Sequence, residues 1–341
     1  MKRIRVALET QFTVGTPTGL GVYAAGLSRA LRERDDVDVV ELQDPGFDLW
    51  RFDRRVYWDQ FRAPALAARA AADVVHFTGG TLPLRKPRRT VLTLHDVVWL
   101  RGVNQGRAYV RWYFGTLARR LARGADALVV DTEVGRSDVA AGLGIDPARI
   151  FVAGVGVDDS FLALARRPDD PPFALCVGTV ERRKDVATAV RALAHVPGLR
   201  LISVGPFTPY ADEIRAVAAQ VGVSDRVELR GYVDAATLRD LYARATMLAF
   251  PSRYEGFGLP PLQALACGLP VVAARIPVVE EVLGDCPAYA EPGDVESFAA
   301  AFKSVLDAVP ADRIERGRTR ARAFTWSSVA QRMMGVYRSL V

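Results

Sequence analysis

The stretch F-P-S-R-Y-E-G-F-G-L-P-P-L-Q-A-L-A-C-G, Phe250 to Gly268, joins an apolar strand to an apolar helix. The strand is Met247 to Phe250, and a pair of prolines marks the first turn of the helix, where proline is tolerated. A helix that begins near Leu259 directs its free N–H groups and positive dipole end beyond the strand, which suits an anion or sugar hydroxyls. Glu255 lies at the lip of the turn. For this junction alone, plain turn chemistry between two core elements is an equal alternative.

The rest of the 341-residue chain repeats this alternation of apolar strands and longer amphipathic segments. The pattern predicts an α/β fold with parallel, doubly wound sheets. The strands expected in the first half are Ile4–Leu8, Val37–Leu42, Asp73–Phe77, Thr90–Leu94, Ala127–Asp131 and Ile150–Ala153. Those expected in the second half are Phe173–Val177, Leu199–Val204, Val227–Leu229, Met247–Phe250 and Pro270–Ala273, followed by a last pair of helices near Val295–Ala308 and Trp326–Leu340.

A polar, proline-rich stretch separates the two series of strands. It reads R-R-P-D-D-P-P, Arg166 to Pro172, the composition of a stiff linker. We therefore expect an N-terminal Rossmann-like domain at residues 1–165 and a C-terminal one at 166–325, with a cleft between them. The last helix, 326–341, is expected to pack back on the N-terminal domain.

Composition limits the class of protein. Half of the residues are apolar and the net charge is +6, and no apolar run reaches the length of a membrane-spanning helix. The first eight residues resemble a short strand rather than a signal peptide. The three cysteines, Cys176, Cys267 and Cys286, are scattered among apolar residues, which predicts buried reduced thiols and a cytoplasmic location. No nucleic-acid partner is expected.

Polar residues at strand ends are informative because ligands bind beyond the carboxyl ends of such sheets. His95 ends the strand L-T-L-H-D and is followed by Asp96, which favours a site over a buried structural histidine. His76 ends V-V-H-F and is open to the same two interpretations. His195, expected within a helix, is interpreted as ordinary surface.

The loop after the first strand contains two glycines. It reads T-P-T-G-L-G-V-Y, Thr16 to Tyr23, and Gly19 and Gly21 would let the backbone approach a phosphate at the start of a helix. The third glycine of G-x-G-x-x-G is missing, which argues against a nicotinamide cofactor.

Two adjacent cations precede a helix in the second series. The stretch V-G-T-V-E-R-R-K-D, Val177 to Asp185, places Arg183 and Lys184 where a diphosphate could bind, although a solvated charged turn is an equal alternative for this stretch alone. The D-x-D spacing of Asp36 and Asp38 is typical of a divalent cation site. We reject it because these residues enter the second strand. Without a metal, Arg183 and Lys184 can neutralise a leaving diphosphate.

Taken together, these motifs resemble glycosyltransferase family 4, retaining enzymes of the GT-B architecture. The resemblance covers nearly the whole chain and is strongest from Phe173 to Asp294. The motifs that carry it are G-L-G-V-Y, T-L-H-D-V, A-G-V-G-V-D (Ala153–Asp158), V-G-T-V-E-R-R-K-D, R-G-Y-V (Arg230–Val233) and P-S-R-Y-E-G-F-G-L-P-P-L-Q.

The resemblance implies transfer of a hexose-type sugar from a nucleotide-diphosphate donor, such as GDP-mannose, with retention at the anomeric carbon. No metal or other cofactor is implied. The leaving phosphate itself can accept the acceptor's proton, so no strong base is implied either. Arg183, Lys184, Glu255 and His95 are the implied catalytic residues. The implied donor-binding residues are Gly19, Gly21, Gly178, Tyr232, Val233, Gly256, Phe257, Gly258, Leu259 and Gln263.

One residue departs from the family pattern. The first glutamate of the family signature is Glu255, but Gln263 stands where the second is expected, at the position implied to bind the donor's ribose. A degenerate protein that binds nucleotide or glycan without catalysis could have lost this carboxylate. A nucleotide-sugar epimerase of the same architecture is the other alternative.

The acceptor is implied to bind the N-terminal domain, as a glycan, lipid-linked or small molecule. Between Arg51 and Ala125 this domain has fifteen Lys or Arg against four Asp, interleaved with aromatic residues. We interpret two segments, Trp50–Arg62 and Arg107–Arg123, as a surface that could rest on an anionic membrane. A buried aromatic face with a solvated basic rim is the alternative.

Overall fold

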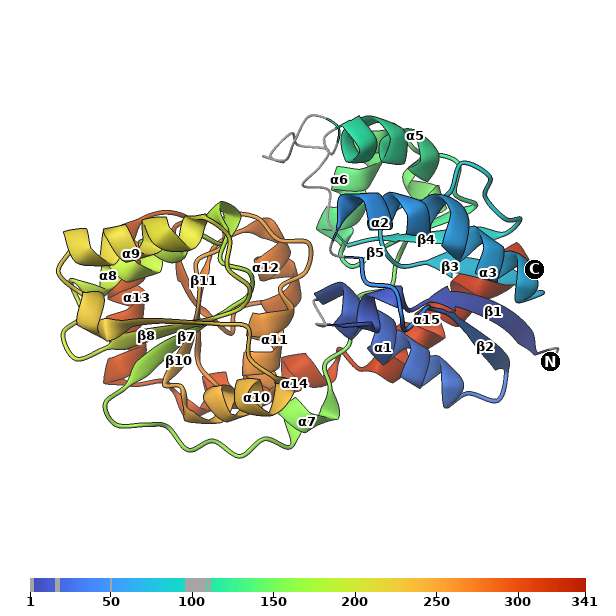
Figure 1. The fold of residues 1–341 in the computed structure, drawn as a ribbon. Coiled ribbons are helices and arrows are strands. Elements are labelled where there is room, and N and C mark those ends of the chain that lie inside the picture. Colours follow the sequence, from blue (N-terminus) through green and yellow to red (C-terminus); the bar gives the residue numbers. More distant parts are fainter. Residues whose placement is uncertain (1–2, 16–18, 50, 96–108, 110–111) are drawn as a thin grey trace. The chain divides into compact units, whose positions relative to one another are not determined.

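The computed structural model describes residues 3–15, 19–49, 51–95, 109 and 112–341. The described chain forms two compact units, each with its own sheet (Figure 1). The N-terminal unit comprises residues 1–156 and 324–341, and the C-terminal unit comprises 157–323. Several residues named above lie outside the described ones: Thr16–Thr18, Trp50, Asp96 and Arg107.

The N-terminal unit contains a six-stranded parallel sheet with the order β2-β1-β3-β4-β5-β6. Its strands are β1 (Ile4–Glu9), β2 (Val37–Leu42), β3 (Val74–Phe77), β4 (Thr90–Leu94), β5 (Ala127–Val130) and β6 (Ile150–Val152). Its helices include α1 (Gly19–Arg32), α2 (Phe52–Tyr57), α3 (Ala63–Arg69), α5 (Arg119–Ala122), α6 (Glu133–Leu143) and α15 (Trp326–Leu340). Two π-helical segments, η2 (Trp58–Arg62) and η4 (Tyr113–Ala118), continue into α3 and α5.

The C-terminal unit has a second six-stranded parallel sheet, with the order β12-β11-β10-β7-β8-β9. Its strands are β7 (Phe173–Val177), β8 (Arg200–Val204), β9 (Val227–Gly231), β10 (Met247–Phe250), β11 (Val271–Ala274) and β12 (Ala288–Ala290). Its helices include α7 (Asp159–Leu162), the 3₁₀ turn η6 (Arg182–Lys184), α8 (Val186–Leu193), α9 (Tyr210–Gln220), α10 (Ala235–Arg244), α11 (Leu259–Ala266), α12 (Pro277–Leu283), α13 (Val295–Asp307) and α14 (Ala311–Arg322).

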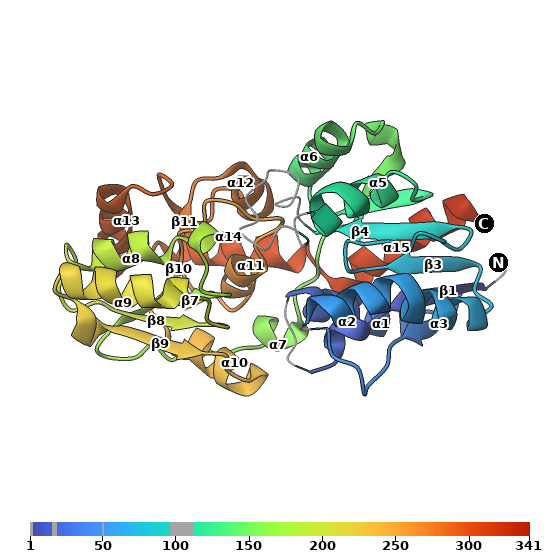
Figure 2. The same ribbon diagram turned by 45° about the horizontal axis from the view of Figure 1, so that its top comes forward.

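Helices cover both faces of the C-terminal sheet. Figure 1 shows α8, α9 and α13 on one face and α10, α11 and α14 on the other, and Figure 2 shows the same layers from a second direction. The strand order reverses between β7 and β10, because the chain runs outward through β8 and β9 and then returns to the other side of β7. Such a reversal point is where open α/β sheets bind ligands, beyond the carboxyl ends of the two strands.

The predicted α/β class and the doubly wound parallel sheets are confirmed. The expected strands are all present, with ends that shift by no more than a residue or two. The sequence reading missed β12 and α14. The strand β12 is very short, and the buried residues of α14, Gly317 and Ala321, have at most a methyl group as side chain. Neither element therefore has a strong apolar period.

The boundary between the units differs from the prediction. The C-terminal unit begins at Val157, not at Arg166. Residues between them pack on α10: the Phe161 ring lies 5.1 Å from that of Tyr242, and the Arg166 guanidinium donates to backbone carbonyls of α10, including that of Ala243 at 3.0 Å. The proline-rich linker therefore belongs to the C-terminal unit. The chain returns to the N-terminal unit at Phe324, so α15 belongs to that unit and lies beside α1 (Figure 1).

The cores of both units are apolar. The three cysteines are free thiols buried in the C-terminal unit. In the part of the chain that the structure describes, none of the helices combines the length and apolar character needed to cross a bilayer.

Candidate functional site

Arg183, Lys184 and Glu255 meet at the carboxyl ends of β7 and β10, the strands between which the C-terminal sheet reverses. Lys184 Nζ donates to Glu255 Oε1 at 2.6 Å, and Arg183 Nη1 donates to Glu255 Oε2 at 3.1 Å. The Glu255 residue is only 7% exposed, whereas the two cations are partly open to solvent. One buried carboxylate thus holds two cations side by side.

Opposing effects set the charge of Glu255. Burial alone raises its pKa, but the charges of Lys184 and Arg183 and the hydrogen bonds from Lys184 and Ser252 together outweigh it, and the net pKa lies below the ordinary value. Glu255 is therefore ionised at neutral pH and keeps both cations in place.

Local backbone geometry brings the two loops together. After η6 the chain turns at Asp185, whose φ of 47° lies in the left-handed region, and α8 begins at the next residue. The Asp185 carboxylate accepts hydrogen bonds from Thr188 at 2.9 Å and from Arg253 Nε at 2.7 Å. The backbone N–H of Arg253 also donates to the Arg183 carbonyl at 2.9 Å. These bonds fix the loop after β10 against the loop after β7.

Gly178 lies under Lys184. Its φ is 136°, and a Cβ built there would lie 3.4 Å from Lys184 Cε. Gly205, at the end of β8, approaches Gly178 so closely that a Cβ on it would lie 2.1 Å from the Gly178 carbonyl oxygen. Because both positions are glycine, the backbones at the ends of β7 and β8 can approach each other closely beneath the two cations.

The loop after β10 ends in α11 as the sequence predicted. Gly258 precedes the first residue, Leu259, with a φ of 95° that favours glycine. Phe257 is buried, and Gly256 lies beside Glu255 in the same turn. The roles proposed for Gly256, Phe257, Gly258 and Leu259 toward a donor stay predictions.

Gln263 lies within α11 and is 8% exposed. Its Oε1 is 3.3 Å from the hydroxyl of Tyr242, which also donates to the Pro260 carbonyl at 3.1 Å. The predicted role of Gln263 at a ribose is untested by these contacts, but they show that Tyr242 is its neighbour within the protein.

Exposed aromatic residues follow two strands of the same sheet. Tyr232 and Val233 come directly after β9, and the Tyr232 ring is largely exposed. Phe207, in the loop after β8, is also exposed and lies next to Gly231. Sequence reasoning missed Phe207, although its place after a predicted strand end was a usable signal.

His95 lies in the N-terminal unit at the end of β4. Its Nδ1 is 2.8 Å from Asp131 Oδ2. Asp131 follows β5, the neighbouring strand, and its side chain is almost fully buried. In the tautomer whose Nδ1 carries the proton, His95 donates to Asp131, and this bond orients the ring. The sequence predicts Asp96 as the companion of His95; Asp96 lies outside the described residues, and the partner observed among the described ones is Asp131.

His76 is a buried structural histidine. Its Nδ1 is 2.8 Å from the hydroxyl of Tyr337 and its Nε2 is 2.7 Å from Thr93 Oγ1. Burial lowers its pKa to about 3, and the positive charge of a protonated His95 lowers it too. His195 lies in the exposed turn after α8 rather than within the helix.

Other predicted features of the N-terminal unit also have definite places. Gly19 is the first residue of α1 and Gly21 is buried in its first turn. Asp36 and Asp38, which we rejected as a metal site, each pair with an arginine. Asp36 contacts Arg34 at 2.9 Å, and Asp38 lies 3.5 Å from Arg5. No three His, Cys, Asp or Glu side chains of the described residues are placed to hold a metal ion.

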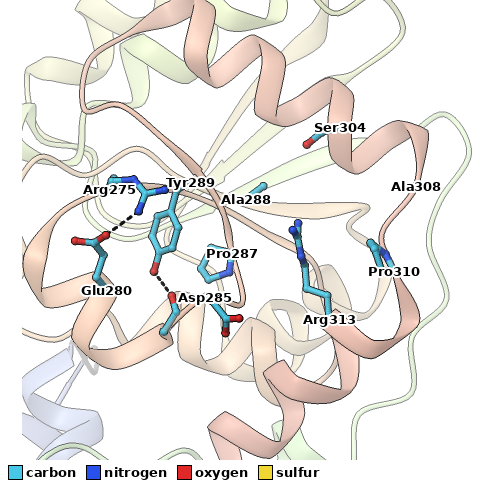
Figure 3. A pocket seen from close by; sticks show the side chains of 11 residues that line it. Arg275, Glu280, Asp285, Pro287, Ala288, Tyr289, Ser304, Ala308, Pro310 and Arg313 are labelled. Atoms are coloured by element: carbon cyan, nitrogen blue, oxygen red, sulfur yellow. Dashed lines mark hydrogen bonds and ion pairs between the residues drawn. The ribbon is translucent and has the colours of Figure 1, made fainter.

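A pocket of about 740 Å³ lies apart from these residues, at the β12 edge of the C-terminal sheet. Figure 3 shows Arg275 over the ring of Tyr289, with Glu280 paired to Arg275 on one side and Arg313 on the other. None of the predicted site residues lines this pocket. Its volume alone does not make it the active site.

Two family profiles match consecutive parts of the chain. "Glycosyltransferase Family 4" matches residues 17–161 and "Glycosyl transferases group 1" matches residues 162–321.

Curated relatives have related names. The chain is 30% identical over 241 residues to MMP alpha-(1->4)-mannosyltransferase of Mycolicibacterium hassiacum, a match that covers 68% of this chain and 58% of that protein. It is 35% identical over 244 residues to D-inositol 3-phosphate glycosyltransferase of Xylanimonas cellulosilytica, covering 62% and 57%. The chain thus spans less than three fifths of the length of these two relatives.

Solved structures share the fold over the whole chain. Sucrose-phosphate synthase from Thermosynechococcus elongatus superposes with a TM-score of 0.75 at 21% identity, covering 99% of each chain. HepE of Anabaena, solved in complex with UDP-glucose, gives 0.72 at 17% identity and covers 99% of this chain and 100% of its own. These likenesses confirm the predicted GT-B fold.

Proposed function

The chain belongs to glycosyltransferase family 4, and on that premise we propose that it is a retaining glycosyltransferase. It would move a hexose-type sugar from a nucleotide-diphosphate donor to a glycan, lipid-linked or small-molecule acceptor. The observation that carries the proposal is the cluster of Arg183, Lys184 and Glu255 at the reversal point of the C-terminal sheet. Two cations fixed there suit the negative charge that develops on a leaving diphosphate.

Contacts within the protein organise the cluster. Glu255 is ionised and holds the two cations at the positions they occupy, so they need little rearrangement to meet a diphosphate. Arg183 offers a planar fork and Lys184 a compact charge, which are complementary ways to bind phosphate oxygens. The leaving phosphate would accept the acceptor's proton, so the chain need not supply a strong base.

The donor class is supported by the names of relatives. They include mannosyltransferases and D-inositol 3-phosphate glycosyltransferases, and HepE was solved with UDP-glucose. GDP-linked and UDP-linked hexoses are therefore the first two classes of donor to test. The neutral amide of Gln263 makes a thymidine diphosphate sugar, whose ribose lacks one hydroxyl, a third class.

A transfer assay tests the proposal. The chain is incubated with nucleotide sugars of the three classes, and release of nucleoside diphosphate and the anomeric configuration of the product are followed by NMR. We expect a product that retains the donor's configuration, and a rate unchanged by EDTA because the two cations replace a metal. Inhibition by EDTA that magnesium or manganese reverses would contradict the metal-free mechanism. Binding without turnover would favour the degenerate alternative, and an epimerised donor the epimerase.

Gln263→Glu should tighten ribonucleoside diphosphates about tenfold and deoxyribonucleoside diphosphates much less. A carboxylate accepts charge-assisted hydrogen bonds of about 1.5–3 kcal/mol, against about 0.5–1.5 kcal/mol for a neutral amide, and a ribose offers it two hydroxyls. A difference of about 1.4 kcal/mol corresponds to the tenfold change. Isothermal titration calorimetry with matched ribose and 2′-deoxyribose ligands measures both.

The neighbour Tyr242 supplies the control for this prediction. Its hydroxyl lies 3.3 Å from Gln263 Oε1, so a new carboxylate could act on Tyr242 instead of the ligand. Tyr242→Phe combined with Gln263→Glu removes that route and should leave the tenfold gain intact. Equal tightening of both nucleotide classes would show that residue 263 does not contact the ribose.

An exposed aromatic surface on the N-terminal unit supports contact with a membrane. Phe61 is 64% exposed and Trp112 is 58% exposed. The Gln60 side chain links the segments that carry these residues. Its Nε2 donates to the Tyr113 hydroxyl at 3.2 Å, and its Oε1 accepts from the backbone N–H of the exposed Leu84 at 2.9 Å. Arginines flank these segments, among them Arg51, Arg54, Arg62, Arg85 and Arg120. We propose that this surface rests on the cytoplasmic leaflet, next to a lipid-linked acceptor.

Cosedimentation with anionic liposomes tests the membrane proposal. Each basic residue near an anionic surface contributes about 1 kcal/mol, and salt screens this attraction, so binding should be seen at low salt and weaken as salt is added. Phe61→Ser with Trp112→Ser should weaken it further by removing the inserted rings. Neutral liposomes are the control. Absence of binding at low salt would mean that the acceptor is soluble and the arginines are a solvated face.

A further inference from the structure

Tyr23 of α1 lies against His95. The two ring centroids are 4.3 Å apart, and the rings meet edge to face at 73°. Tyr23 is buried, so its ring forms a fixed wall on one side of the imidazole. The Asp131 carboxylate holds Nδ1 at 2.8 Å and fixes the ring along that bond. Contact with the Tyr23 ring then restricts how the His95 imidazole can tilt about its bond to Asp131.

Trp326, the first residue of α15, lies on the other side of Tyr23. Their ring centroids are 5.9 Å apart at 66°. The indole occupies a slot that two glycines create: a Cβ on Gly26 of α1 would lie 2.1 Å from Trp326 Cε2, and a Cβ on Gly156 would lie 2.5 Å from its Cγ. The slot admits the indole because neither glycine carries a side chain.

The place of Trp326 in the chain is also unusual. Gly156 is the last residue before the chain leaves the N-terminal unit, and Phe324 is the first after it returns. Trp326 therefore packs on the outgoing segment and directly follows the incoming one. Its position depends on both segments that connect the two units.

A second buried path joins α15 to Tyr23. Tyr337 contacts His76, His76 contacts Thr93 Oγ1 at 2.7 Å, and Thr93 Oγ1 lies 3.4 Å from the Tyr23 hydroxyl. The four residues are all buried. Tyr23 is thus held at its ring by Trp326 and at its hydroxyl by the polar path from Tyr337.

We infer that Trp326 and Tyr23 are positioning residues for His95, so that the C-terminal helix α15 sets the orientation of the catalytic imidazole. The inference rests on the proposed function, in which His95 lines the donor sugar. If the ring tilted away from that orientation, the Nε2 atom that faces the substrate would be misplaced. Misplacement of a catalytic group by about 1 Å can cost up to a hundredfold in rate.

Gly26→Ala tests the inference. Alanine at this mid-helix position favours the helix by its propensity, but its Cβ must displace the indole. Gly335→Ala is the matched control, because Gly335 lies in α15 and a Cβ there has nothing within 4 Å. We expect kcat to fall about tenfold with Gly26→Ala, with KM for the acceptor little changed, and to stay within about twofold with Gly335→Ala.

NMR of the histidine side chains separates positioning from general damage. The chain has only three histidines, so ¹⁵N signals of His76, His95 and His195 can be resolved and assigned. The charged and titratable groups that face His95 are Asp131, His76 and Tyr23 among the described residues. With Gly26→Ala we expect the His95 signals and their titration to shift, while those of exposed His195 stay fixed. A variant that is merely less stable would leave the native His95 signals in place.

Two further variants keep the inference testable if Gly26→Ala fails to fold. Tyr23→Phe keeps the ring and loses only the contact of its hydroxyl with Thr93, so it should shift the His95 signals much less than Tyr23→Leu, which removes the ring. Unchanged His95 signals in Gly26→Ala or in Tyr23→Leu would overturn the inference. The NMR measurement needs no substrate, so it decides the positioning role even if no sugar transfer is found; shifted signals without transfer would instead count against the proposed function.

Discussion

Replacing Lys184 or Arg183 by alanine is expected to lower the rate of sugar transfer about a hundredfold while leaving the fold intact. Each variant removes one preorganised cation from the place where the leaving diphosphate develops charge. Loss of one such donor typically costs about 3 kcal/mol in the activation barrier, which corresponds to a hundredfold or more in rate. Steady-state kinetics with the donor identified in the transfer assay measures the effect.

The fold should tolerate either change because Glu255 keeps one partner. Without Lys184, Arg183 still donates to Glu255 Oε2 and to the Tyr254 carbonyl at 3.3 Å. Without Arg183, Lys184 still donates to Glu255 Oε1. A thermal melt of each variant checks this expectation. Glu255 would be left without either cation only in the double variant, which is the one expected to be unstable.

Arg182→Ala is the matched control. Arg182 belongs to the same 3₁₀ turn and carries the same charge, but its side chain is exposed and pairs with Glu213 of α9. Its loss should leave transfer within about threefold of the wild-type rate, since an exposed ion pair contributes about 0–1 kcal/mol. If Lys184→Ala and Arg183→Ala both stay within about threefold as well, the two cations do not stabilise the leaving group.

The sequence was sufficient to place each residue of the C-terminal cluster at a strand end, because each lies in a local motif. Arg183 and Lys184 are adjacent in sequence and Glu255 lies in a single turn, so the spacing of glycines, prolines and apolar runs places each at a strand end. That the three would form one cluster followed only from the pairing of β7 with β10, which are far apart in sequence. The structure supplied this adjacency.

The His95 site was harder to predict because its partner comes from another strand. Asp96 is adjacent in sequence and attracted the assignment, but the contact observed in the described residues is to Asp131, at the end of the neighbouring strand β5. The sequence does place Asp131 at the end of a predicted strand. Identifying it as the partner of His95, however, requires the order of the strands in the sheet. The contacts from Trp326 and Tyr337 could not be found in this way, because they need the packing of α15 on α1.

The π-helical pitch of two segments of the N-terminal unit also escaped prediction. The segments η2 and η4 are π-helical, and Tyr113 links them by donating to Asp59 Oδ2 at 2.9 Å. The Asp59 carboxylate also receives Arg55, and both residues are buried. An apolar period of 3.6 predicts a helix but not its local pitch. Such segments are frequent at functional sites. Here the exposed Phe61 lies in η2, and the exposed Trp112 directly precedes η4.

The free energy of unfolding is expected to fall as the pH is lowered from about 6.5, with His76 as one identifiable cause. The pKa of His76 is lowered to about 3, first by burial and then by the charge of His95. Between about 6.5 and 3 the unfolded chain therefore binds a proton at this position that the folded chain does not. The unfolded state gains about 1.4 kcal/mol per pH unit across this window, or about 2 kcal/mol at pH 5 relative to pH 7.

His76→Gln isolates this contribution. Glutamine cannot take up the proton, and its amide can replace part of the hydrogen bonding to Tyr337 and Thr93. At pH 7 we expect the variant to have a lower free energy of unfolding than the wild type, because glutamine packs less well. At pH 5 this difference between the two proteins should be about 2 kcal/mol smaller. Because the chain has two units, hydrogen exchange of amides in β3 and β4 is a better measure than a single global melt.

His195→Gln is the control for the titration. His195 is exposed after α8, so its replacement should leave the stability unchanged. If the protection of β3 and β4 falls equally with pH in the wild type and in His76→Gln, another group causes the loss. In that case His76 must be protonated in the folded chain near its ordinary pKa. The buried contacts that run from Tyr337 to Tyr23 would then have to rearrange to accommodate the charge.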